Sequence, residues 1–149
     1  MDSSGDIKRI EFKVFGEPKS QLRSHLRVLG NKVHAYTPDQ TKLAEHSFLM
    51  QCLAHRPKEL IYGPVMLGLK MFRSIPKAIM KSDTNRQLAI DGILQPTTKP
   101  DLSNYTKLAE DVMTGLFYRD DAQIVGYLPG MGKYYSMTPR IEVVIEYTE

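Results

Sequence analysis

Acidic residues, one amide and one lysine recur at short intervals in one segment of an otherwise basic chain. The run Asp101-Leu102-Ser103-Asn104-Tyr105-Thr106-Lys107 is followed by Asp111 and then by the pair Asp120-Asp121. Carboxylates that lie close together bind hard cations such as Mg²⁺, and a nearby lysine suits a negatively charged phosphate. The combination predicts metal-dependent phosphodiester chemistry.

A helix is predicted from Leu102 to Thr114, closed by Gly115. At about 100° per residue, its apolar residues fall on one broad arc that must face a core: Leu102, Tyr105, Leu108, Ala109, Val112, Met113 and Leu116. Asn104, Lys107 and Asp111 share a sector at the edge of that arc. Asp101 stands at the N-terminal end, where free backbone N–H groups stabilise an anion. The alternative is structural: Asp101 is an N-cap, and Lys107 and Asp111 form a surface ion pair.

The Asp120-Asp121 pair precedes an expected strand at residues 123–128. Aspartate is common in turns, which is the structural alternative. If the strand lies beside the start of the helix, Asp121 and Asp101 can share a cation. Neighbouring carboxylates without a cation would have raised pKa values and would lower stability. Spacing alone leaves open whether these residues meet.

Composition and charge favour a globular DNA-acting protein. The 149 residues carry a net charge of +3. Lysine and arginine gather in the N-terminal fifth and the middle of the chain, around a small acidic segment, which is the charge layout of a metal-dependent nuclease; a solvated charged surface is the alternative. The four histidines are dispersed and the single Cys52 reads as a buried thiol, which argues against zinc. No apolar run is long enough to span a bilayer, so we expect a cytoplasmic protein without membrane contact.

The pattern of elements predicts a single α+β domain over residues 1–149, with a mixed or antiparallel sheet packed by two main helices. We expect strands at 10–14, 60–72, 123–128 and 140–147, and two short extended pieces, 26–29 and 32–36, around a Gly30-Asn31 turn. A helix should begin at Thr37-Pro38-Asp39 and run toward Pro57 with an apolar stripe that includes Leu43 and Met50. A short helix is expected within 76–91, and loops at 92–100 and 129–132.

Several of these residues together form a familiar pattern. It comprises Lys99-Pro100-Asp101, Asn104, Lys107, Asp111, Gly115, Tyr118, Asp120-Asp121, Gln123-Ile124, Lys133-Tyr134-Tyr135 and Pro139-Arg140-Ile141-Glu142-Val143. In types and spacing this resembles the RusA family of Holliday-junction resolvases, which is found in bacteria, often on phage or prophage DNA. The resemblance is strongest over residues 99–145.

The resemblance implies a homodimeric endonuclease that uses Mg²⁺, or alternatively Mn²⁺, and nicks paired strands across four-way DNA junctions in recombination and repair. Asp101 and Asp121 correspond to metal-binding aspartates and Lys107 to an essential lysine, while Asn104 would brace the Asp121 loop or orient a carboxylate. The family usually has a second aspartate where this chain has Ser103, so Asp120 or Asp111 is expected to fill in, with Asp120 favoured as a metal ligand. Contacts to the DNA backbone are expected from Lys19, Arg23, Arg27, Arg86 and Lys99.

Two other interpretations stay open. In one, the Ser103 departure marks a catalytically weakened or silent protein that still binds branched DNA. In the other, the chain is a structural or interaction domain whose aspartates only cap helices and form turns.

Overall fold

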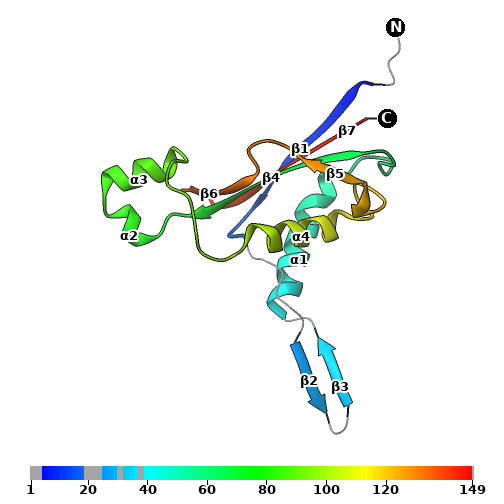
Figure 1. Cartoon of the computed structure of the whole chain (residues 1–149), viewed down its shortest axis with the longest axis horizontal. Coiled ribbons are helices and arrows are strands. Elements are labelled where there is room, and N and C mark those ends of the chain that lie inside the picture. The colour runs from blue at the N-terminus through cyan, green and yellow to red at the C-terminus, as the bar shows by residue number, and fades with distance from the viewer. Residues whose placement is uncertain (1–4, 19–24, 30–31, 37–38, 149) are drawn as a thin grey trace.

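The structure, a computed structural model, describes residues 5–18, 25–29, 32–36 and 39–148. Its centre is a five-stranded mixed sheet, seen nearly edge-on in Figure 1. The strands are β1 (Ile7–Phe15), β4 (Val65–Ser74), β5 (Ile124–Tyr127), β6 (Gly132–Ser136) and β7 (Arg140–Thr148). β7 lies between β1 and β4 and is antiparallel to both, whereas β5 and β6 run parallel to β4 along its other side. The predicted α+β fold with a mixed sheet is confirmed.

One face of this sheet is covered by two helices, α1 (Asp39–Cys52) and α4 (Leu102–Met113), which lie on the same side of it in Figure 1. A short 3₁₀ turn, η1 (Leu53–His55), follows α1. Successive side chains of a strand point to opposite faces, so alternate residues of the strands point toward the helices. The buried core includes Phe12, Val14, Phe48, Cys52, Leu67, Leu69, Leu108, Met113, Val143 and Ile145. The two main helices and the buried cysteine therefore agree with the prediction.

The predicted apolar stripe of α1 is wrong at two positions. Leu43 and Met50 are 70% and 55% exposed, whereas Phe48 and Cys52 on the same helix are buried. The strand expected from residue 60 begins at Val65; before it, Ile61 forms an isolated bridge with Tyr118. β6 was not predicted, because its residues are all half-buried and show no alternation of polar and apolar side chains.

The segment 76–91, expected to hold one helix, contains two: α2 (Lys77–Met80) and α3 (Asp83–Ile90). Ser82 separates them, since its backbone is extended (φ −106°, ψ 120°). Its side-chain oxygen accepts a hydrogen bond from the Asn85 N–H at 3.2 Å. A serine in this position caps a new helix rather than continuing the old one.

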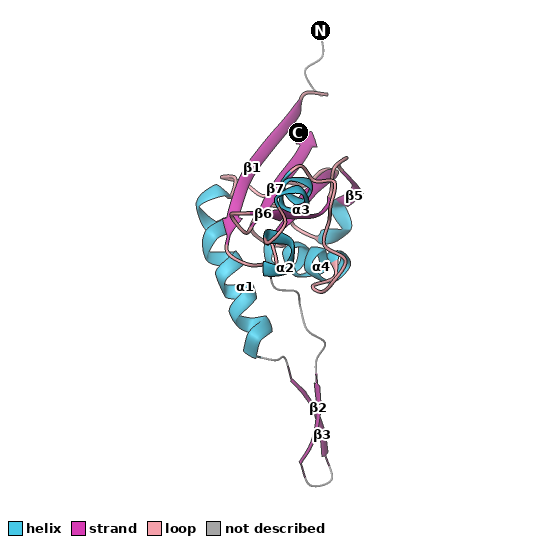
Figure 2. Ribbon diagram, turned by 90° about the vertical axis from the view of Figure 1, so that its left-hand side faces the viewer, coloured by secondary structure: helices cyan, strands magenta, loops and turns pink. Residues whose placement is uncertain are grey.

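Strands β2 (His25–Leu29) and β3 (Lys32–Tyr36) form a separate antiparallel hairpin. Figure 2 shows it extending away from the rest of the molecule, beyond the end of α1. The two predicted extended pieces are confirmed, while the Gly30-Asn31 turn and the Thr37-Pro38 helix start lie outside the described residues. Within the described residues, no helix is both long enough and apolar enough to cross a membrane.

Candidate functional site

Helix α4 has one buried face, and polar side chains lie on the part of its surface that is exposed to solvent. Tyr105, Leu108 and Met113 are buried. Lys107 and Asp111 lie outside this buried face, and their side chains are exposed to solvent. Lys107 Nζ donates to Asp111 Oδ1 at 3.0 Å. This i, i+4 ion pair is the structural alternative that the sequence allowed.

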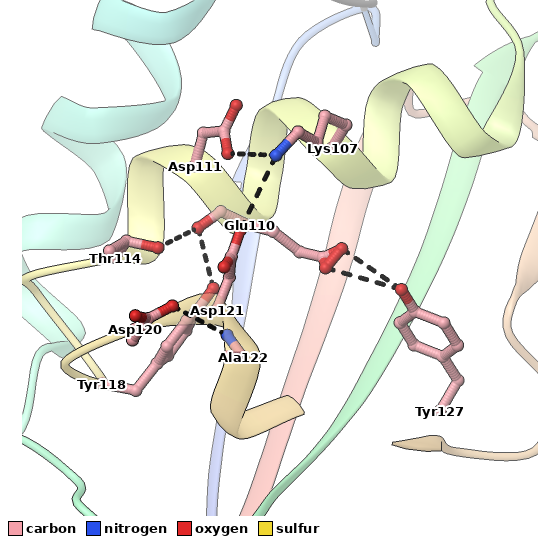
Figure 3. A network of polar contacts seen from close by, with 9 residues as sticks. All are labelled: Lys107, Glu110, Asp111, Thr114, Tyr118, Asp120, Asp121, Ala122 and Tyr127. Carbon is pink, nitrogen blue, oxygen red and sulfur yellow. Dashed lines mark hydrogen bonds and ion pairs between the residues drawn. The ribbon is translucent and has the colours of Figure 1, made fainter. Parts of the chain in front are cut away.

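The same lysine also contacts a second element. Lys107 Nζ lies 3.6 Å from Asp121 Oδ2, and Asp121 belongs to η2 (Asp121–Gln123), a 3₁₀ turn between α4 and β5 (Figure 3). The hydrogen bond and charge of Asp111 raise the pKa of Lys107, and the charge of Asp121 raises it further. The structure therefore brings together two of the predicted catalytic residues around a firmly protonated ammonium group.

The turn that carries Asp121 is held by its neighbours in sequence. Asp120 is the N-cap of η2, and its Oδ1 accepts from the Ala122 N–H at 2.9 Å. This hydrogen bond is the main reason why the pKa of the Asp120 carboxyl is lowered. The Gln123 side chain accepts from the backbone N–H groups of Arg119 and Asp120, both at 2.9 Å, which completes a capping box. Asp120 thus has a structural role that the sequence analysis considered only as an alternative.

Asp101 lies at the start of α4, and its backbone oxygen accepts from the Tyr105 N–H as the first bond of the helix. Its carboxylate is turned toward Asn104, whose Nδ2 lies 3.4 Å from Asp101 Oδ2. This contact is of the kind that the second predicted role of Asn104, the orientation of a carboxylate, requires. Ser103 is exposed in the same turn of the helix.

The loop that leads into Asp101 is tied to the sheet. Arg73 Nη1, from β4, donates to Thr98 Oγ1 at 3.0 Å, and Lys133 Nζ, from β6, donates to the Thr98 carbonyl. Gln95 Nε2 in turn donates to the Lys133 carbonyl at 3.1 Å. The unpredicted strand β6 therefore helps to place Asp101.

A metal implied by the family can be tested against these positions. Carboxylate oxygens are the donors that a hard divalent cation prefers, so the chemistry of Asp101 and Asp121 fits Mg²⁺ or Mn²⁺. Within the described residues, however, no three or more His, Cys, Asp or Glu side chains are grouped so that they could hold a metal ion. Asp101, Asp120 and Asp121 are therefore not assembled into the predicted three-carboxylate set.

Sequence reasoning missed one acidic residue of this region. The Glu110 carboxylate accepts from the Tyr127 hydroxyl, with oxygen–oxygen distances of 3.2 and 3.5 Å, and so joins α4 to β5 (Figure 3). Partial burial raises the pKa of Glu110, and the nearby charges of Asp121 and Asp111 add to the effect. Its position three residues after Lys107 was the available signal, because residues so spaced are neighbours on a helix.

The structure describes the side chains of only some of the residues that were predicted to contact DNA. Lys99 is exposed beside the start of α4. Arg86 joins α2 to α3: its Nη2 lies 2.7 Å from Asp83 Oδ1 and its Nη1 3.3 Å from the Met80 carbonyl. Arg27 lies in β2, while its side chain, Lys19 and Arg23 fall outside what the structure describes.

Comparison with known proteins gives the class of this chain. It belongs to a family of endodeoxyribonucleases, which are hydrolases that act on DNA. The family is that of the endodeoxyribonuclease RusA, whose model matches residues 16–146, so the chain belongs to the RusA family. The chain is also similar to YqaN of Bacillus subtilis (strain 168), described as an uncharacterized protein, with 38% identity over 136 residues that cover 91% of this chain and 94% of YqaN. The resemblance read from residues 99–145 is confirmed.

Proposed function

We propose that the protein resolves four-way (Holliday) DNA junctions by paired nicks during recombination and repair. The observation that carries this proposal is the contact of Lys107 with Asp121 across two elements, in a chain of the RusA family. A protonated lysine beside a carboxylate suits a reaction in which charge accumulates on a phosphate.

In the proposed reaction, Asp101 and Asp121 would hold Mg²⁺ or Mn²⁺, which would supply a Lewis acid and lower the pKa of a bound water. Lys107 stabilises charge on the phosphate oxygens. Asp111 keeps Lys107 protonated and oriented, and Asn104 orients the Asp101 carboxylate. We leave Asp120 out of this ligand set because one of its oxygens already caps η2.

The DNA would be held by basic residues on the projecting parts of the chain. Arg27 lies in the β2–β3 hairpin, Lys19 and Arg23 precede it in sequence, and Lys99 is exposed next to Asp101. Phosphate contacts of this kind position a duplex without reading its sequence. We therefore propose that they hold the junction arms.

We further propose that the working form is a homodimer, because a two-fold symmetric junction presents two equivalent strands and paired nicks need two sites. β4 and β7 are inner strands of the sheet, so a second copy cannot pair with their edges. The edge strand of the sheet on that side is β1, and its Ile7 side chain is 69% accessible for this contact.

A second candidate is a silent protein that binds branched DNA without cutting it. It is favoured by Ser103, which replaces a carboxylate of the family pattern, and by the missing three-ligand group among the described residues. Incubating the purified protein with a labelled four-way junction, in Mg²⁺ and in EDTA, separates the candidates. Cleavage in Mg²⁺ but not in EDTA supports the resolvase, and binding without cleavage supports the silent protein. If the protein neither cuts nor binds the junction, the remaining interpretation is an interaction domain.

A further inference from the structure

The amide of Gln123 uses its complete hydrogen-bonding capacity, two donors and two acceptor sites. Its Oε1 accepts from the Arg119 and Asp120 N–H groups, as described above. Its Nε2 donates to the carbonyl oxygens of Ile61 at 2.8 Å and Gly63 at 3.0 Å. One side chain therefore joins the turn before β5 to the segment that precedes β4.

These bonds act on the backbone at both ends of Asp121. The Asp120 N–H is held by Gln123, and the Ala122 N–H is held by the Asp120 carboxylate. The backbone N–H of Gln123 also donates to the Asp120 carbonyl at 3.0 Å. The direction of the Asp121 side chain, and hence its approach to Lys107, depends on this small set of bonds.

The two ends of the turn are anchored independently of Gln123. Phe117 and Tyr118 are fully buried on one side of it, and Ile124 pairs with Val65 in the sheet on the other. A change at Gln123 therefore releases the interior of the turn while the flanking core stays in place.

We propose that Gln123 is a positioning residue that holds Asp121 against Lys107. The inference rests on the proposed function, since it assigns Gln123 a part in the reaction carried by Lys107 and Asp121. In this role the side chain acts through the backbone of Arg119 and Asp120 on one side and of Ile61 and Gly63 on the other, and not as a ligand of DNA or metal.

Gln123→Ala removes all four bonds and should lower the cleavage rate at saturating junction by about 10- to 100-fold, as changes behind a metal ligand do. The affinity for the junction in EDTA should stay within about twofold, because no phosphate contact is lost. Gln51→Ala is the matched control: the Gln51 amide also bridges backbone groups, with Oε1 2.7 Å from the Phe15 nitrogen and Nε2 3.0 Å from the Phe15 oxygen. Gln51 belongs to α1 and Phe15 to β1, so this variant should cut at close to the wild-type rate.

Gln123→Glu tests the donor half of the amide. The introduced carboxylate still accepts from Arg119 and Asp120 but faces the Ile61 and Gly63 carbonyls without a donor. This variant should therefore cut more slowly than wild type at the same pH. Its urea unfolding midpoint, measured beside that of wild type, separates a misplaced turn from a general loss of stability.

Crystal structures of wild type and Gln123→Ala give a readout that needs no activity. We expect the separation of Asp121 Oδ2 from Lys107 Nζ to exceed its 3.6 Å in the variant. If it does not, or if Gln123→Ala cuts as fast as Gln51→Ala, the proposal is overturned. If the wild type does not cut junctions at all, the proposed function fails, and the two crystal structures still decide whether Gln123 positions Asp121.

Discussion

The Lys107 ammonium on α4 lies 3.6 Å from Asp121 Oδ2 on the following turn and 3.0 Å from Asp111 Oδ1 on its own helix. The Lys107 ammonium therefore contacts two carboxylates, and the Lys107 side chain is 57% exposed. A phosphate can reach this ammonium group from solvent.

Lys107→Ala should lower the single-turnover cleavage rate by about 10²–10³-fold if the ammonium stabilises the transition state as one oxyanion donor does. Asp121→Asn should abolish cleavage, since an amide is a poor ligand for a divalent cation. In EDTA, Asp121→Asn should bind the junction at least as well as wild type, because it loses a negative charge, and Lys107→Ala should lose no more affinity than one phosphate contact provides, measured by fluorescence anisotropy. Lys77→Ala, at an exposed lysine of α2, serves as the control. Wild-type cutting by either site variant would remove that residue from the mechanism.

Asp120 can be tested as a cap and as a ligand with two substitutions. Asparagine caps about as well as aspartate, and alanine costs about 1 kcal/mol of stability at a cap. If Asp120 acts through the Ala122 N–H, Asp120→Asn should retain most of the cleavage rate, and Asp120→Ala should lose both stability and rate. Urea unfolding and cleavage assays on the two variants provide the comparison. If both variants were equally inactive while Asp120→Asn kept the stability of wild type, Asp120 would act as a metal ligand and not only as a cap.

Ser103 marks the departure of this chain from the family pattern. A hydroxyl cannot offset the charge of a cation, so Ser103→Ala should reduce activity only modestly, and Ser103→Asp should lower the Mg²⁺ concentration needed for half-maximal cleavage. Titrations of Mg²⁺ against cleavage rate measure both effects. If Ser103→Ala were as inactive as Asp101→Asn, the serine itself would be a ligand.

Glu110 should make stability depend on pH. Its pKa is raised in the folded protein, mainly by burial, so the folded state favours the protonated carboxyl. The associated stability is complete below the unfolded-state pKa of about 4.3 and is lost as pH rises through the higher folded-state value. Glu110→Gln carries no such loss, so its free energy of unfolding, relative to that of wild type, should increase as pH rises from about 4. Urea unfolding at several pH values measures this increase, with a substitution of the exposed Glu59, Glu59→Gln, as control. If the difference in free energy of unfolding between Glu110→Gln and wild type did not change with pH, the raised pKa of Glu110 would be contradicted.

Binding of the junction should weaken steeply with salt, because lysines and arginines on phosphates release condensed counterions. Lys99→Ala should reduce the slope of log affinity against log salt by about 1 and leave the preference for branched DNA unchanged. Anisotropy titrations at several salt concentrations, with the exposed Lys58→Ala as control, test this. A flat salt dependence of the wild type would argue against phosphate contacts altogether.

The sequence was sufficient where the interactions are local. The 3.6-residue period of α4 placed Lys107 and Asp111 together, and the predicted pair exists. The contact of Lys107 with Asp121 depends on how the chain returns after Gly115, and the bonds of Gln123 reach carbonyl groups 60 and 62 residues away. Spacing along the chain carries no information about such distances. Gln123 was part of the sequence pattern that resembles the RusA family, but the pattern did not indicate what the residue does. Its hydrogen bonds in the structure indicate that it positions Asp121.

The position of β7 has a consequence for the order in which the molecule is made. This strand contains the last described residues, yet it is the antiparallel neighbour of both β1 and β4. During synthesis, the ribosome completes β1, β4 and both halves of the acidic site before the strand that unites them emerges. Because a domain folds as a unit, a nascent chain that stops before Arg140 lacks the strand that joins β1 to β4 and the buried side chains that this strand adds to the core. We therefore expect DNA cutting only from polypeptides that already include β7.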